Sequence, residues 1–127
     1  MLIDAALLPL KKLADEGDPE ALVKMSDIFY EGRGTAVNYS LSKKYLVMLN
    51  HYDPDYLWQI GYGYGSLLYL IGDVCSRLEE WSDAKYYYQK AIDYLRDSFT
   101  KEFADREIRY YKLESLIEQI EQKIASQ

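Results

Sequence analysis

The stretch from Asp18 to Gly34 limits what this chain can fold into more than any other. Asp18 suits a helix N-cap because its carboxylate accepts hydrogen bonds from backbone N–H groups of the first turn. Pro19 suits the first helical position, where no N–H is needed. Apolar residues then recur at helical spacing, namely Ala21, Leu22, Met25, Ile28 and Phe29. Gly32 and Gly34 predict the end of this helix and a sharp turn.

The beginning of this stretch returns 35 residues later. The second copy is Asp53-Pro54-Asp55-Tyr56-Leu57, and in its continuation Ile60-Gly61 and Tyr64 match Met25-Ser26 and Phe29. A period of about 35 residues is typical of helix–turn–helix repeats. The sequence therefore predicts two repeat-like helix pairs, at about 18–50 and 53–97, with flanking helices at about 2–16 and 100–125.

A second register competes with the first in the middle of the chain. It consists of Leu68, Ile71, Gly72, Cys75, Ala84, Tyr88 and Ala91. Ile71-Gly72 follows Ile60-Gly61 by about three helical turns, so one helix would present the same face twice. We therefore expect one extended helix from Pro54 to about Leu78. Its interior glycines each cost about 1 kcal/mol relative to alanine, and a break at Gly61–Gly65 is the alternative.

The last stretch of the chain predicts a long capping helix. Thr100 could cap it, and its apolar stripe is Phe103, Tyr110, Leu113, Leu116, Ile117, Ile120 and Ile124. The expected fold class is all-α, a short α-solenoid of about six helices in antiparallel pairs, forming the single domain 1–127. Two repeats are fewer than the three or so that a stable stack needs. The flanking helices must therefore complete the core, or the chain pairs with another copy of itself.

The order Ala21, Met25-Ser26, Phe29, Gly32, Gly34 resembles the Sel-one-like repeat, with Met25 and Ser26 where leucine and glycine are usual. The second register resembles the related tetratricopeptide repeat. Together the resemblance covers about residues 14–96. It implies that the first helix of each pair lines a groove that holds a partner's peptide or helix. The groove residues carried over are Glu20, Val23, Asp27, Tyr30 and Glu31 from the first pair, and Tyr69, Asp73, Ser76 and Arg77 from the second.

Composition narrows the classes of partner. The formal net charge is −6, which argues against general nucleic-acid binding and suits a partner protein with a basic surface. The single cysteine, Cys75, indicates a reducing compartment. The N-terminal residues 1–13 make a poor signal peptide, and no apolar stretch approaches the ~20 residues of a membrane span. We therefore expect a cytoplasmic protein without a membrane segment.

The sequence contains no recognisable pattern of catalytic, metal-binding or phosphate-binding residues. His51 is the only histidine, and no base–nucleophile pairing is recognisable around it. One cysteine and one histidine do not build a structural zinc site. The glycines from Gly61 to Gly65 lack both the spacing and the preceding strand of a phosphate-binding loop. We expect no catalytic residues, no metal and no cofactor, and so no enzyme.

The fourteen tyrosines are the unusual feature of the composition. Neighbours on a helix point about 100° apart, so the runs Tyr86–Tyr88 and Tyr110–Tyr111 cannot all face one core. Amphipathic packing and a binding surface explain exposed rings about equally well. The expected function is a non-catalytic module that binds a protein or peptide in an acidic, tyrosine-rich groove. The alternative is a dedicated inhibitor or immunity protein that neutralises a basic toxin or enzyme.

Overall fold

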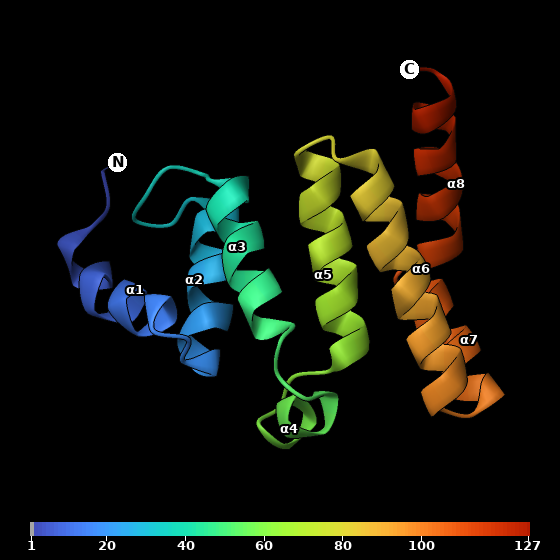
Figure 1. Ribbon diagram of the computed structural model, residues 1–127, viewed down its shortest axis with the longest axis horizontal. Helices are drawn as coiled ribbons and strands as arrows, with labels where there is room; N and C mark the ends of the chain where they lie inside the picture. The colour runs from blue at the N-terminus through green and yellow to red at the C-terminus, as the bar shows by residue number, and fades with distance from the viewer. Residues whose placement is uncertain (1) are drawn as a thin grey trace. The chain divides into compact units, whose positions relative to one another are not determined.

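The computed structural model describes residues 2–127, which contain eight α-helices, one short 3₁₀ turn and one isolated β-bridge (Figure 1). The chain divides into two compact units, Met1–Asp53 (unit 1) and Pro54–Gln127 (unit 2). The all-α class and its antiparallel helix pairs are confirmed, and the single domain stays a prediction. The expected number of about six helices is wrong because two of the expected helices, 54–78 and 100–125, are interrupted.

Unit 1 contains the 3₁₀ turn η1 (Ala5–Leu7) and the helices α1 (Leu8–Asp15), α2 (Pro19–Glu31) and α3 (Tyr39–Leu49). The first helix starts later than the expected residue 2. Ile3 instead forms a β-bridge with Thr35, and the Asp4 carboxylate accepts a hydrogen bond from the Ala6 N–H at 3.0 Å. Pro9 lies in the first turn of α1, where its missing N–H costs no hydrogen bond. The proline therefore marks the beginning of this helix.

Helix α2 begins and ends where the sequence predicts. The Asp18 carboxylate accepts a hydrogen bond from the Ala21 N–H at 2.9 Å, as an N-cap does. Gly32 ends the helix with a φ of 76°, in the left-handed region. A Cβ atom at this position would lie 2.9 Å from Val37 Cγ2. Both the backbone angle and the space therefore require glycine.

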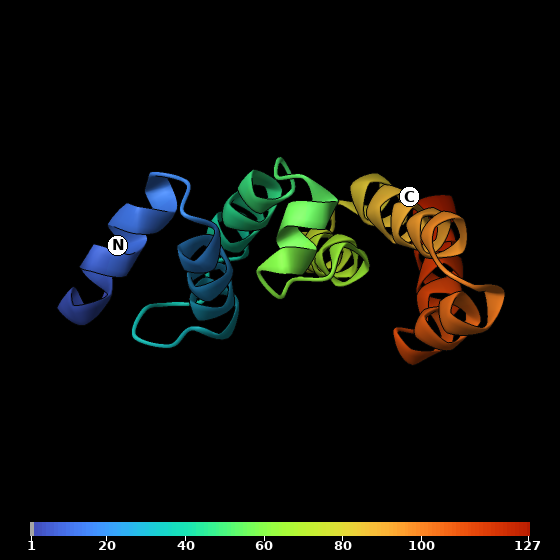
Figure 2. The same ribbon diagram turned by 90° about the horizontal axis from the view of Figure 1, so that it is seen from below.

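Helices α2 and α3 lie side by side and run antiparallel (Figure 1 and Figure 2). Two buried serines let them approach closely, and Ser42 Oγ donates a hydrogen bond to the Ser26 carbonyl at 2.8 Å. The fully buried rings of Phe29 and Tyr45 stack with their centroids 6.0 Å apart. This pair of helices, with Ala14 from α1, supplies the core of unit 1.

A polar network ties α1 to α3 beside this core. Tyr45 donates its hydroxyl proton to Asp15 Oδ1 at 2.7 Å, and Lys11 Nζ lies 2.9 Å from Asp15 Oδ2. The pKa of the Asp15 carboxyl is lowered, first by the hydrogen bond from Tyr45 and second by the hydrogen bond from Lys11. Burial, followed by the hydrogen bond to Asp15, raises the pKa of Tyr45.

Replacing Tyr45 by phenylalanine removes only the hydroxyl, and we expect it to destabilise the chain by about 1–2 kcal/mol. The contribution of Asp15 is complete above its unfolded pKa of about 3.9 and is lost as the pH falls through its lower folded pKa. The variant should therefore lose less stability on acidification than the wild type. Urea unfolding followed by far-UV circular dichroism, at neutral pH and below pH ~4, measures both effects.

The control is Tyr39→Phe, the same chemical change in the same helix. The Tyr39 ring packs edge to face on Tyr30 at 5.4 Å, and its hydroxyl makes no hydrogen bond within residues 2–127. We expect a change within about 0.5 kcal/mol. Equal losses in the two variants would contradict a role for the hydroxyl of Tyr45.

Unit 2 contains α4 (Pro54–Gln59), α5 (Tyr64–Arg77), α6 (Trp81–Ser98), α7 (Lys101–Tyr110) and α8 (Leu113–Ala125). The single helix expected over 54–78 is wrong, and the alternative break among the glycines is confirmed. Gly61 has a φ of 94°, and the Tyr62 N–H bonds back to the Leu57 carbonyl at 2.7 Å. The chain therefore turns between α4 and α5.

At the isoleucine–glycine step, only the second of the two competing registers is buried. Ile71 and Gly72 lie in the core, whereas Ile60 is 38% exposed and Gly61 is exposed. Ala84, Tyr88 and Ala91 of α6 face the same core. The expectation that one helix presents the same face twice is therefore wrong, and α5 is the helix that pairs with α6 (Figure 1).

The expected long helix over 100–125 is also wrong. It divides at Tyr111-Lys112, where Lys112 has a φ of 55°. Helix α8 then packs along α6 and runs antiparallel to it (Figure 1). Its apolar residues Leu113, Ile117 and Ile120 are buried. The terminal segment is therefore a bent pair of helices.

Candidate partner-binding surface

Five of the expected groove residues lie on α2. Helix α2 buries Ala21, Leu22, Met25, Ser26 and Phe29. The opposite side carries Glu20, Val23, Asp27, Tyr30 and Glu31, which we call the α2 face. Its three carboxylates are exposed, and Val23 and Tyr30 are partly buried at its edge. Helical spacing of three and four residues thus brings these five side chains onto one side of unit 1.

The α2 face is acidic and only partly neutralised. Glu20 pairs with Lys24 at 3.0 Å, and Glu31 pairs with Arg33 Nε at 3.0 Å. All four side chains are more than half exposed, so each pair contributes little to stability.

Asp27 lies in the middle of the face. Desolvation by its surroundings is the first cause that raises the pKa of the Asp27 carboxyl, and the negative charge of Glu31 is the second. Arg33 opposes both. A cation brought close to Asp27 would therefore be favoured there.

The other four expected residues lie on α5 in unit 2. Tyr69, Asp73 and Ser76 are partly buried and Arg77 is exposed. Burial, followed by the charge of Asp73, raises the pKa of the Tyr69 hydroxyl. This set lies in unit 2, whereas the α2 face lies in unit 1.

The chain itself covers part of the α5 set. The Tyr111 ring lies 4.7 Å from the Tyr69 ring, between centroids, and the hydroxyls of Tyr111 and Ser66 are hydrogen-bonded at 2.7 Å. Tyr69 also contacts the buried ring of Tyr88 at 6.0 Å. Tyr111, at the end of α7, therefore covers α5 at Ser66 and Tyr69.

Sequence reasoning missed Ser66 and Tyr111. Ser66 precedes Tyr69 by three residues, so extending the helical period would have found it. Tyr111 comes from another helix, and no local pattern indicates that it meets α5.

The remaining candidates are distributed as follows. Of the tyrosine run, Tyr88 is buried and Tyr86 is 57% exposed, which confirms that the run does not face one core. Tyr110 is exposed beside the partly buried Tyr111. The thiol of Cys75 is buried in α5, and His51 is exposed. Within residues 2–127, no cluster of three or more histidine, cysteine or acidic side chains has an arrangement that could hold a metal ion.

A scan of the chain against protein-family models found no match, and neither did searches of curated proteins and of solved structures. The likeness to the Sel-one-like and tetratricopeptide repeats therefore stays a prediction. None of the helices described in residues 2–127 combines the length and apolar character that crossing a membrane requires.

Proposed function

We propose that this protein is a non-catalytic interaction module whose α2 face binds a protein or peptide with a basic surface. The observation that carries the proposal is the row of exposed carboxylates of Glu20, Asp27 and Glu31 along one side of α2. Val23 and Tyr30 lie at the edge of this row. The likeness to the helical repeats supports the same face, because the first helix of such a repeat pair lines the groove.

The chemistry of the α2 face indicates the kind of partner. Lysine or arginine would relieve the repulsion between Asp27 and Glu31. An apolar side chain next to that cation would contact Tyr30 and Val23, since tyrosine favours interface cores. The partner is therefore a segment with a basic residue beside an apolar one. Charge of this kind also accelerates association with a basic protein.

We also propose that the protein is a repeat of the Sel-one-like or tetratricopeptide type and that it is cytoplasmic. The buried register of Gly72, Ala84 and Tyr88 supports the repeat assignment. The single cysteine supports a reducing compartment.

The first test is affinity capture from the source cell with three immobilised baits. The wild type is compared with Asp27→Asn/Glu31→Gln, which removes two charges from the α2 face and preserves side-chain shape. Glu102→Gln/Glu118→Gln is the matched control, because it removes two charges from exposed side chains of α7 and α8. Captured proteins are eluted with rising salt and quantified by mass spectrometry.

We expect proteins that the wild type and the control retain to be lost from the α2-face variant. Loss of two favourable charges should weaken binding roughly tenfold or more. Equal retention by all three baits would exclude the α2 face as the binding surface. Capture of a single basic enzyme in stoichiometric amount would instead favour the alternative function, a dedicated inhibitor of that enzyme.

A further inference from the structure

The corner between α7 and α8 is built on an unusual residue. Lys112 has a φ of 55°, a left-handed conformation that glycine adopts readily and other residues adopt at a cost. It occupies the position after the helix C-cap Tyr111, where glycine is the common residue. The corner therefore holds a strained lysine where a glycine would be relaxed.

A second corner in unit 2 shows what a complete turn looks like. Glu79, between α5 and α6, has a φ of 58°. There the Glu79 N–H bonds to the Ser76 carbonyl at 3.0 Å and the Glu80 N–H to the Cys75 carbonyl at 2.9 Å, the two bonds of a Schellman motif. At the α7–α8 corner the Lys112 N–H bonds to the Arg109 carbonyl at 3.1 Å. Within residues 2–127, the second bond, from Leu113 to Ile108, is not formed.

The local sequence favours a straight helix through this corner. Residues 101–125 contain neither glycine nor proline. The apolar stripe continues across the corner from Phe103 through Tyr110 and Leu113 to Ile124. Straightening Lys112 would remove its backbone strain and join α7 and α8 into one helix.

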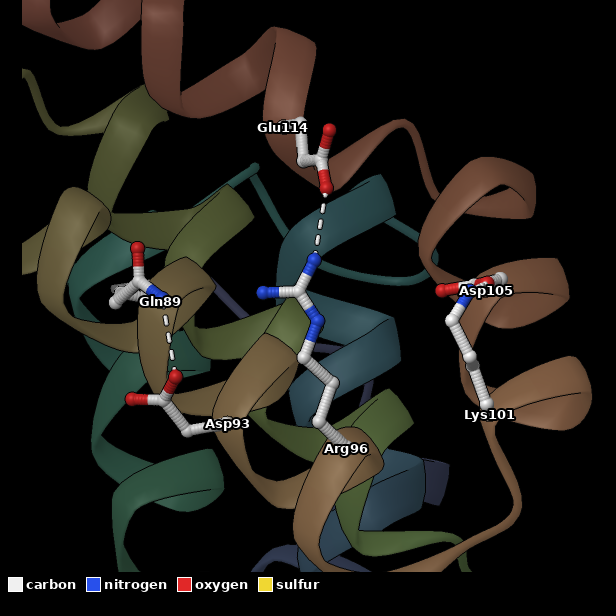
Figure 3. Close-up of polar contacts among 6 residues, drawn as sticks. All are labelled: Gln89, Asp93, Arg96, Lys101, Asp105 and Glu114. Atoms are coloured by element: carbon white, nitrogen blue, oxygen red, sulfur yellow. Dashed lines mark hydrogen bonds and ion pairs between the residues drawn. The ribbon is translucent and has the colours of Figure 1, made fainter.

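What keeps the corner bent is packing elsewhere. The Tyr111 ring and hydroxyl contact Tyr69 and Ser66, as described above. Helix α8 buries Leu113, Ile117 and Ile120. Between α6 and α8, Arg96 pairs with Glu114 at 3.1 Å and Lys85 with Glu121 at 3.9 Å (Figure 3 draws the first pair).

We propose that the α7–α8 corner is a hinge, and that its straightening lets α8 of one copy pack on α6 of a second copy, giving a domain-swapped dimer. Each α8 would find in the second copy the surface that it leaves in its own chain, so no new contact type is required. The same movement takes Tyr111 away from Tyr69 and Ser66 and uncovers that part of α5. This inference does not depend on the binding role of the α2 face.

Three variants test the hinge, and the quantity compared is the monomer–dimer equilibrium. The full chain is incubated at high concentration in mild urea, and the urea is then removed. Sedimentation measures the fraction of dimer. Lys112→Gly relaxes the bent corner and weakens the straight helix. The equilibrium between the bent and the straight corner should shift roughly tenfold towards the bent form. Because a swapped dimer contains two straight corners, its association constant should fall roughly a hundredfold. Tyr111→Ala removes the contacts with Tyr69 and Ser66 and should increase the dimer fraction. Glu79→Gly relieves the same kind of strain at a corner that does not open, and should leave the dimer fraction unchanged.

Cross-linking distinguishes a swapped dimer from any other. A carbodiimide joins Lys85 to Glu121, whose charged atoms lie 3.9 Å apart. In a dimer prepared from isotopically heavy and light protein, the swapped arrangement predicts heavy–light Lys85–Glu121 peptides. A dimer that yields only heavy–heavy and light–light peptides would overturn the proposal. Persistence of the monomer in both the wild type and Tyr111→Ala would overturn it as well.

Discussion

Replacing Phe29 by alanine is expected to destabilise the chain by about 3–5 kcal/mol, because it removes a fully buried aromatic ring and leaves a cavity. The ring stacks against Tyr45, which is itself buried and fixed by its hydrogen bond to Asp15. Tyr45 is therefore unable to move into the vacated space without losing that bond. Limited relaxation places the cost towards the upper part of the range.

Urea unfolding followed by far-UV circular dichroism measures this loss. Both tryptophans, Trp58 and Trp81, belong to unit 2, so circular dichroism is the readout that includes the helices of unit 1. Tyr86→Ala is the control, since the Tyr86 ring is 57% exposed and should cost less than about 1 kcal/mol. A loss at Phe29 as small as that at Tyr86 would contradict the assigned core.

The second large effect is expected at Gly72, where α5 meets α6. A Cβ atom here would lie 2.7 Å from both Cδ1 and Cε1 of Tyr88, a ring that is itself 1% exposed. Leucine at position 72 should destabilise the chain by about 3 kcal/mol, because the Tyr88 ring has no free space to enter. The gain of about 1 kcal/mol that a helix makes from losing a glycine is too small to compensate.

A double-mutant cycle with Tyr88→Ala separates the clash from other effects. Removing the ring makes room for the leucine, so the double variant should be more stable than the sum of the two single losses predicts. Gly63→Leu is the matched control, since a Cβ there lies 3.7 Å from Ser66 Oγ and should cost less than about 1 kcal/mol. Strict additivity of Gly72→Leu and Tyr88→Ala would mean that the two residues are not in contact.

Local signals predicted the helices that begin and end through their own residues. The ends of α2 are determined by the cap at Asp18, the missing N–H of Pro19 and the left-handed turn at Gly32. All three effects can be predicted from the sequence. Thr100 likewise caps α7 as expected, because its hydroxyl oxygen accepts a hydrogen bond from the Phe103 N–H at 3.2 Å. Such effects depend on neighbours within one turn, which is why sequence alone identifies them.

The interruptions of the two expected helices depend on contacts between residues that are far apart in the sequence. At Gly61 the sequence permitted both a helix and a turn, and burial of Ile71 and Gly72 in place of Ile60 and Gly61 decided between them. At Lys112 no local signal indicates a break. There the bend comes from packing of α8 on α6 and of Tyr111 on Tyr69. A pattern of period 3.6 describes one helix and does not contain such contacts.

The candidate surface was predictable to the same extent. The period of α2 placed Glu20, Asp27 and Glu31 on one side, and that side is exposed. On α5 the same reasoning selected Tyr69, which Tyr111 partly covers. Whether a predicted helix face is open depends on the rest of the chain, and here α2 has the more exposed of the two faces.

The measurement that tests the central proposal most directly is a calorimetric titration of the captured partner, once purified, into the wild type and into Asp27→Asn/Glu31→Gln. We expect the variant to bind roughly tenfold more weakly and its affinity to depend less on salt, because two charges on the α2 face are gone. The control Glu102→Gln/Glu118→Gln should bind like the wild type. Equal dissociation constants for the wild type and the α2-face variant at low salt would contradict the proposed function.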